Sequence, residues 1–198
     1  MAPGVIILTA IFTSIFGGVN TLWDRRYGFM NKALTSPISR SAIALGKMSA
    51  ISLIAALQAS LIIGIALAIG VTFPNPLMII PIMGIVILFS LGFSGISVTL
   101  AATAKSQETF WGMINLLGMP LFMLSPALFP LELLPNWLAV VAKLNPVTYT
   151  VLLVRELMTG VSEGGVPILI SIAVIFAFVV AMVAIASYVF TREVNKPF

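Results

Sequence analysis

The sequence predicts an all-α polytopic membrane protein with five transmembrane helices in a single transmembrane domain, residues 1–198. Of the 198 residues, 60% are hydrophobic and only 8% are charged, whereas soluble domains have about 45–50% and about 25%. The charged residues gather in a few clusters between long apolar stretches. No continuous charged surface could therefore cover a soluble core, and lipid is the expected solvent.

Five apolar runs are long enough to cross a bilayer. A hydrocarbon core about 30 Å thick takes about 20 helical residues. None of the runs has a charge in its interior, and one central Lys or Asp would cost roughly 2.5–3.5 kcal/mol. The predicted spans are approximately residues 3–22, 48–71, 77–103, 109–129 and 166–190.

The distribution of Lys and Arg predicts how these spans are oriented, because cytoplasmic loops are enriched in basic residues. Alternate connections carry most of them: Arg25, Arg26, Lys32, Arg40 and Lys47 in the first, Lys105 in the third, and Arg192 with Lys196 in the C-terminal tail. The opposite side has only Lys143 and Arg155. We therefore expect a multi-pass protein of the cell (inner or plasma) membrane, with the N-terminus outside and the C-terminus in the cytoplasm.

The connection between the first two spans is too polar to cross the membrane and too apolar for a free loop. Apolar and basic residues alternate in it: Phe29, Met30, Leu34, Arg25, Arg26 and Lys32. A short amphipathic helix is expected, then a break at Ser36 before Pro37, and Ser39 suits the N-cap of the next helix. Two interpretations remain open: a helix lying on anionic headgroups, or a docking element for a soluble partner.

Residues 128–160 are apolar but interrupted by Pro130, Pro135 and Pro146. Proline breaks a helix interior, so two short helices are expected rather than a span. Non-helical backbone at membrane depth must be satisfied by protein or water, which favours a re-entrant segment near the outer surface. Trp137 and Tyr149 suit that interface. Outer segments of this kind occur in membrane proteins of every function.

The missing residue types narrow the function. The chain has no Cys and no His, so a membrane-embedded enzyme has few candidate groups beyond a Ser–Lys pair, and no metal site is expected. An ion-coupled secondary transporter usually needs ionisable groups inside the membrane, and the predicted spans contain none. Both remain as alternatives to a transporter with an external motor. Nucleic acid is not an expected partner, because the basic residues form no continuous face.

The chain contains two sets of short motifs, one in each half. The first connection holds Asp24-Arg25-Arg26-Tyr27-Gly28-Phe29, Ser36-Pro37-Ile38-Ser39-Arg40 and Leu45-Gly46-Lys47. The C-terminal half holds Asn115-Leu116-Leu117, Pro120-Leu121, Phe129-Pro130-Leu131, Leu134-Pro135-x-Trp137-Leu138, Asn145-Pro146-x-Thr148-Tyr149 and Arg155. With both sets, the chain resembles the membrane subunits of type-2 ATP-binding-cassette (ABC) exporters, in the branch that includes drug-resistance and polysaccharide or nodulation-factor export permeases. Two residues depart from the family pattern: Arg26, where an acidic residue is usual, and Pro126, where Gly is usual.

The resemblance implies a coupling helix, residues 24–40, that docks on the ATPase through Asp24, Arg25, Arg26, Gly28, Phe29, Lys32, Ser36, Pro37 and Arg40. It implies an outer gate in residues 128–160, formed by Pro130, Pro135, Trp137, Asn145, Pro146, Tyr149 and Arg155. It also implies six spans, of which this sequence lacks the first.

The same resemblance implies an export permease for a hydrophobic or amphipathic substrate (drug, lipid or glycan). The complex would hold a second permease subunit, as a homo- or heterodimer, and separate ATPase subunits. The pathway would lie between spans 3–22 and 109–129. The chain contains no Gly-rich loop followed by Lys and Ser or Thr, the pattern that cradles nucleotide phosphates. We therefore expect it to be no enzyme and to hold no cofactor, with ATP and Mg²⁺ bound by the partner ATPase.

Overall fold

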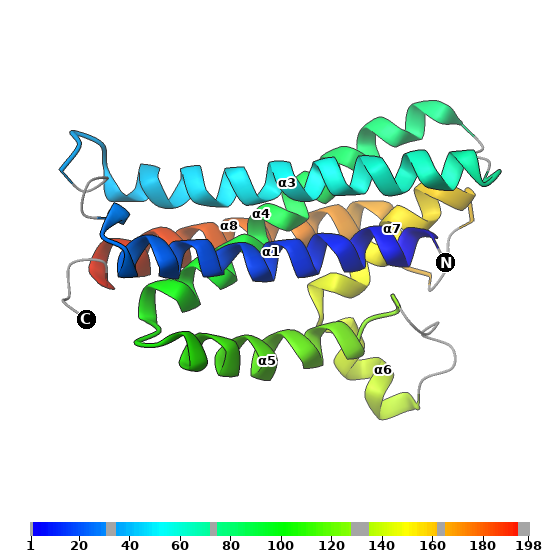
Figure 1. Ribbon diagram of the computed structural model, residues 1–198. Coiled ribbons are helices and arrows are strands. Elements are labelled where there is room, and N and C mark those ends of the chain that lie inside the picture. The colour runs from blue at the N-terminus through cyan, green and yellow to red at the C-terminus, as the bar shows by residue number, and fades with distance from the viewer. Residues whose placement is uncertain (1, 31–34, 72–74, 128–134, 162–164, 194–198) are drawn as a thin grey trace.

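The computed structural model describes residues 2–30, 35–71, 75–127, 135–161 and 165–193. All regular secondary structure in these ranges is helical, which confirms the predicted all-α class. Four long helices, α1 (Ala2–Arg26), α3 (Arg40–Ala68), α4 (Ile79–Thr103) and α8 (Ile168–Glu193), form a bundle in which α4 packs against the other three (Figure 1). A short 3₁₀ turn, η1 (Pro76–Met78), leads into α4.

Three shorter helices complete the described fold: α5 (Gln107–Met123), α6 (Asn136–Lys143) and α7 (Pro146–Thr159). Local sequence explains several helix ends. The Ser39 side chain accepts a hydrogen bond from the backbone N–H of Ala42 at 3.3 Å, which confirms the predicted N-cap of α3. At the end of α7, Gly160 adopts a left-handed φ of 72°, which closes the helix without steric cost.

Four of the described helices are long and apolar enough to cross a membrane: Pro3–Arg26, Arg40–Ala68, Pro76–Thr103 and Ile168–Glu193. They overlap four of the five predicted spans. The remaining prediction, residues 109–129, is represented by the shorter helix α5, whose 17 residues extend about 26 Å at 1.5 Å per residue. Pro120 inside α5 cannot donate to the preceding turn, and Pro126 disfavours helical geometry at Ser125. The apolar run therefore continues past the end of its helix.

Glycines bring the central helices close together. A Cβ atom on Gly18 of α1 would lie 2.7 Å from Ser97 of α4, and one on Gly95 of α4 would lie 3.0 Å from the Met182 carbonyl oxygen of α8. At the α1–α4 crossing, the Ser97 hydroxyl donates to the carbonyl of Ser14 at 2.7 Å. Small residues at such crossings permit close packing in membranes, where interhelical hydrogen bonds also contribute.

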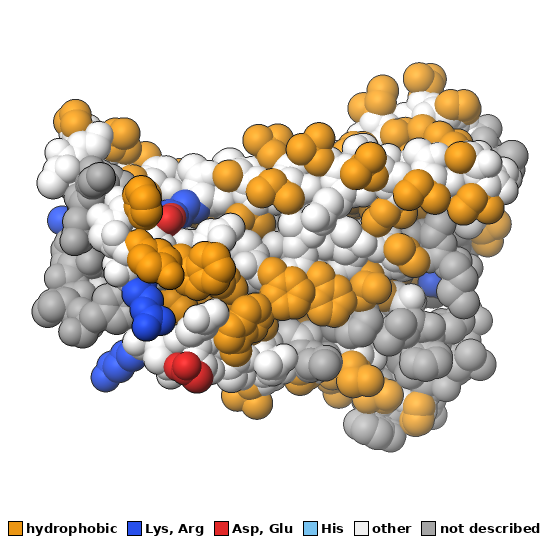
Figure 2. All heavy atoms as spheres, viewed as in Figure 1, with side chains coloured by type: hydrophobic (Ala, Val, Ile, Leu, Met, Phe, Trp, Pro, Cys, Tyr) orange, Lys and Arg blue, Asp and Glu red, His pale blue; other side chains and the backbone are white. Residues whose placement is uncertain are grey.

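Large apolar side chains point outward along the bundle. Leu57 and Leu61 on α3 are each 67% exposed and Leu169 on α8 is 77% exposed. In Figure 2, hydrophobic side chains follow the length of the face in view. So much exposed apolar surface would be unfavourable in water, and it suits contact with lipid. The chain is a multi-pass membrane protein.

The bundle has two chemically different ends. One end, called the basic end, holds the last turns of α1, α4 and α8 and the first turns of α3 and α5 (Figure 1). The described basic residues of these turns and their connections are Arg25, Arg26, Arg40, Lys47, Lys105 and Arg192. The opposite end, called the far end, holds the chain's N-terminus, η1, α6 and the start of α8.

Candidate functional site

The predicted docking residues lie at the basic end, apart from Lys32, which falls outside the described residues. Asp24, Arg25 and Arg26 form the last turn of α1. Gly28 follows with a left-handed φ of 77°, a conformation that favours glycine over residues with a Cβ. Ser36 is half-buried and Pro37 is exposed, and Arg40 begins α3. The segment therefore turns sharply at the tip of the bundle.

Two of these residues face inward and brace the end of α1. The Nη1 of Arg25 donates to the carbonyl of Ala101 at 3.2 Å and to that of Ala102, both in the last turn of α4. The last carbonyls of a helix have no partner within it, and a cation is favourable there. The carboxylate of Asp24 accepts from Nζ of Lys47 on α3. The end of α1 is therefore fastened to both α3 and α4.

Other residues of the same segment face outward. Tyr27 is 72% exposed, Phe29 60% and Ile38 55%, and the Arg26 side chain is exposed too. Large apolar side chains exposed at the tip of the same segment are candidates for a contact surface. We call Tyr27, Phe29 and Ile38 the outward patch.

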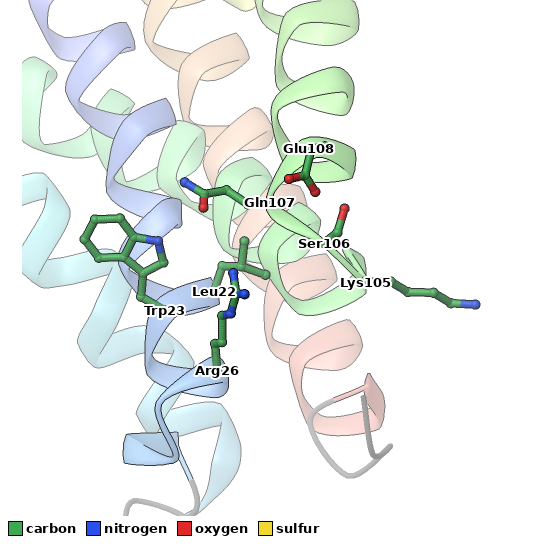
Figure 3. Close-up of a pocket in the computed structure, with 7 residues that line it drawn as sticks. All are labelled: Leu22, Trp23, Arg26, Lys105, Ser106, Gln107 and Glu108. Carbon is green, nitrogen blue, oxygen red and sulfur yellow. The ribbon is translucent and has the colours of Figure 1, made fainter.

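A pocket of about 400 Å³ opens at the basic end between the end of α1 and the start of α5. One wall is formed by Leu22, Trp23 and Arg26 of α1. The other is formed by the connection after α4 and the first residues of α5: Lys105, Ser106, Gln107 and Glu108 (Figure 3). In Figure 3 the Arg26 side chain extends toward the first turn of α5, whereas Lys105 extends away from the other labelled residues. We call it the basic-end pocket.

The start of α5 is capped from within this pocket. The Ser106 hydroxyl accepts from the backbone N–H of Thr109 at 3.1 Å. A hydrogen bond from its own backbone N–H and one from Ser106 hold the pKa of Glu108 below its usual value, and the positive charge of Arg26 lowers it further. Glu108 therefore stays ionised at neutral pH. Sequence reasoning missed this pocket because its two walls come from distant parts of the chain.

An aromatic seam continues from the basic-end pocket along α1 and α5. The ring centroids of Phe12 and Phe16 lie 5.7 Å apart, and those of Phe16 and Trp111 lie 5.5 Å apart. A small cavity of about 50 Å³ between the helices is lined by Ile11, Phe12, Ile15, Phe16, Ile114, Asn115 and Gly118. These are the two helices between which the family resemblance placed the pathway.

At the far end, the predicted gate residues build the corner between α6 and α7. Asn145 is buried, and its Oδ1 accepts from the backbone N–H of Val147 at 3.0 Å, which caps α7. Its Nδ2 donates to the Leu121 carbonyl of α5 at 2.5 Å. Pro146 occupies the first turn of α7, where its fixed φ suits the helix. Asn145 thus joins the corner to α5.

Two further gate residues reinforce this corner. The Tyr149 hydroxyl donates to the Lys143 carbonyl at 2.7 Å, and Nη2 of Arg155 donates to the Pro126 carbonyl at 3.2 Å. Pro135 immediately precedes α6 and Trp137 belongs to that helix, whereas Pro130 lies outside the described residues. Asn145, Tyr149 and Arg155 therefore fasten the α6–α7 corner to α5 and to the segment that follows it.

Comparison with known proteins agrees with this architecture. The sequence pattern of the ABC-2 type transporter family matches residues 1–159. The transport permease ycf38 of Cyanophora paradoxa is 30% identical over 78% of this chain and 54% of its own length. Nodulation protein J of Sinorhizobium fredii is 24% identical over 89% of this chain and 68% of its length.

The daunorubicin resistance ABC transporter permease protein DrrB1 of Streptomyces coeruleorubidus is 22% identical over 89% of this chain and 64% of its own length. The chain spans about half the length of the ycf38 permeases that it matches. The family match covers most of the sequence, including α1, the start of α3, α5 and the α6–α7 corner. The chain therefore belongs to the ABC-2 type transporter family.

Proposed function

We propose that the chain is the membrane-spanning permease subunit of an ATP-driven exporter. It works with a separate ATPase subunit, which binds ATP and Mg²⁺, and with a second permease subunit. The observation that carries this proposal is the outward patch of Tyr27, Phe29 and Ile38, held at the tip of a segment whose base is fastened to the bundle.

The contacts at the basic end supply a route for mechanical coupling. A push on the outward patch would reach α4 through Arg25 and α3 through the Asp24–Lys47 pair. Because α4 also packs against α8, the helices would tilt together as a rigid body, which is a common means of switching between two states. This arrangement favours docking over a helix that only lies on headgroups.

The sidedness follows from the charges. Cytoplasmic loops are enriched in Lys and Arg, and the basic end gathers Arg25, Arg26, Arg40, Lys47 and Lys105. We therefore assign the basic end to the cytoplasm and the far end, with the α6–α7 corner, to the outside of the cell membrane. In this orientation the outward patch faces the ATPase, and the corner lies where substrate would leave.

The substrate class is hydrophobic or amphipathic: a drug, a lipid or a glycan carried on an apolar group. The aromatic seam between α1 and α5 offers rings and few charges, which suits apolar or stacked groups. The name of one relative, a daunorubicin resistance permease, and that of another, nodulation protein J, support export of such compounds.

Co-purification with the candidate ATPase subunit from mild detergent tests the proposal. The native chain is compared with Phe29→Asp, in the outward patch, and with Leu144→Asp, an equally polar change at a residue that is 83% exposed at the far end. We expect the native chain and Leu144→Asp to retain the ATPase and Phe29→Asp to lose it. Equal retention by all three, or none by the native chain, would contradict docking through this patch.

A further inference from the structure

We propose that the basic-end pocket binds the phosphate group of an amphiphile, with Arg26 as the anion-binding side chain and Lys105 as a second positive charge at the rim of the pocket. The pocket's volume of about 400 Å³ falls in the range of about 300–1,000 Å³ that is typical of small-molecule sites. It opens at the end of the bundle, where the apolar surface of the helices meets the charged connections.

The side chains of the pocket leave positive charge available. Among the described residues, the Arg26 guanidinium forms no ion pair within 4.0 Å. The carboxylate of Glu108 accepts hydrogen bonds from its own backbone N–H and from Ser106, and the charge of Arg26 acts on it as well; with Lys105, the pocket lining still holds two cations and one carboxylate. A planar guanidinium binds phosphate oxygens through two parallel hydrogen bonds, and a lysine adds a mobile point charge.

This site does not depend on the free N–H groups at the start of α5. The Ser106 hydroxyl already accepts from the Thr109 N–H at 3.1 Å, and the carboxylate of Glu108 accepts from the backbone N–H of the same residue. The anion would therefore be bound by the Arg26 side chain at the end of α1, with the charge of Lys105 at the rim of the pocket. The geometry of Arg26, which points toward the first turn of α5 in Figure 3, places its guanidinium at the pocket.

The apolar wall indicates that the phosphate belongs to an amphiphile. Leu22 and Trp23 line the pocket on the α1 side, and the exposed rings of Phe16 and Phe12 continue from them along the same helix toward the middle of the bundle's length. Trp23 is 46% exposed, as suits an indole at a membrane interface. When the phosphate group of an amphiphile lies in the pocket, the hydrocarbon tail of the same molecule would lie against this apolar surface.

Binding itself is a property of the pocket, but its role as the entry site for a transported amphiphile rests on the proposed function. The two can fail separately. If the ATPase does not co-purify while phosphate-dependent lipid binding persists, the proposed function fails and the site stands. If the ATPase is retained but phospholipid binding is unchanged when Arg26 and Lys105 are replaced, the site fails and the proposed function stands.

The test measures lipid binding to the purified full chain by native mass spectrometry. The probes are dioleoylphosphatidylglycerol and dioleoylglycerol, which share their tails and differ in the phosphoglycerol head. We expect the phospholipid to bind at least about tenfold more tightly, and the double variant Arg26→Gln/Lys105→Gln to lose that difference, as expected when charge-assisted hydrogen bonds to a phosphate are removed.

Two further variants control for charge and for folding. Arg192→Gln/Lys143→Gln removes the same net charge at positions outside the pocket, and should bind the phospholipid as the native chain does. Glu108→Gln removes a negative charge from the pocket, and should strengthen phospholipid binding about two- to threefold. A gain of binding cannot result from a misfolded chain. Equal binding of the two lipids, or equal loss in both double variants, would overturn the proposal.

Competition with 10 mM glycerol 3-phosphate identifies the source of the phosphate. Displacement of the phospholipid in the native chain, but not in Arg26→Gln/Lys105→Gln, would support a site that also takes phosphate from solution. Persistent phospholipid binding that still requires Arg26 would support a site for which the lipid tail is needed. Both outcomes are consistent with phosphate recognition by the pocket. Equal displacement in the native chain and in Arg26→Gln/Lys105→Gln would contradict it.

Discussion

Replacing Arg25 with Ala should destabilise the bundle, although the residue lies in a predicted docking segment. The substitution removes two charge-assisted hydrogen bonds to the last turn of α4 and an attraction to Glu193 at the end of α8. One hydrogen bond to a charged group contributes about 1.5–3 kcal/mol, and a cation at a helix C-terminus about 0.3–1 kcal/mol. Because Arg25 is only half-buried, solvent screening places the expected loss near the lower end, about 2 kcal/mol.

The assay is thermal unfolding in mild detergent, followed by tryptophan fluorescence. A loss of about 2 kcal/mol should lower the melting temperature by about 4–8 °C in a chain of this size. Arg25→Lys retains the charge but lacks the guanidinium whose Nη1 reaches both carbonyls, and should recover about half of the loss. The matched control is Arg26→Ala, which removes an exposed neighbour with no such contacts and should change stability by no more than about 0.5 kcal/mol.

Two results would refute this reasoning. Arg25→Ala could melt within 1 °C of the native chain, which would mean that the α4 carbonyls are satisfied equally well without it. Alternatively, Arg25→Ala and Arg26→Ala could destabilise the chain equally, which would mean that total charge at the basic end matters and the specific contact to α4 does not.

Three more predictions follow from the packing. Gly18→Leu should destabilise the bundle by about 1–3 kcal/mol, because the new side chain would clash with α4. The control is Gly64→Leu, which should unfold at the native temperature because a Cβ there has no atom within 4 Å. Equal melting temperatures of the two variants would argue against the close crossing of α1 and α4. Asn145→Ala should cost about 1–3 kcal/mol, since it removes the α7 cap and the bond to α5, and a native melting temperature would exclude its joining role. A double-mutant cycle on Asp24 and Lys47, both partly exposed, should give a coupling of about 0.2–1 kcal/mol, and zero coupling would remove the pair from the mechanical route.

Sequence alone could predict the long helices because their signal is local. Apolar runs without an interior charge specify spans whatever they pack against, and Ser39 caps its helix through a bond three residues away. The length of α5 also had a local signal, the Ser125–Pro126 pair, which ends helical geometry near the end of the apolar run. Counting apolar residues without weighing that pair extended the span predicted at residues 109–129 past the end of α5.

The roles of the adjacent arginines required knowledge of the helix register. Arg25 continues a buried stripe of α1 that includes Ile11, Gly18 and Leu22, at the three- and four-residue spacing of one helix face. Arg26 instead lies on the exposed face of α1, in line with Phe16 and Trp23. Both belong to one basic cluster in the sequence, so composition could not separate the residue that caps α4 from the one that lines a pocket.

The basic-end pocket could not be predicted from the sequence at all. Its α1 wall, residues 22–26, and its other wall, residues 105–108, come together only because α4 returns the chain to the same end of the bundle. The far-end motif was easier, since Asn145, Pro146 and Tyr149 lie close together in sequence. Even there, the bond from Asn145 to α5 spans 24 residues and follows from tertiary packing.

The most direct test of the account is chemical crosslinking of the outward patch to the ATPase in the membrane. The chain has no cysteine, so Phe29→Cys introduces a single thiol, and Leu144→Cys provides the matched thiol at the far end. With a short thiol-to-amine crosslinker, the account predicts a product between Phe29→Cys and the ATPase subunit and none with Leu144→Cys. A product from Leu144→Cys in place of Phe29→Cys would contradict the assignment of the basic end as the docking surface.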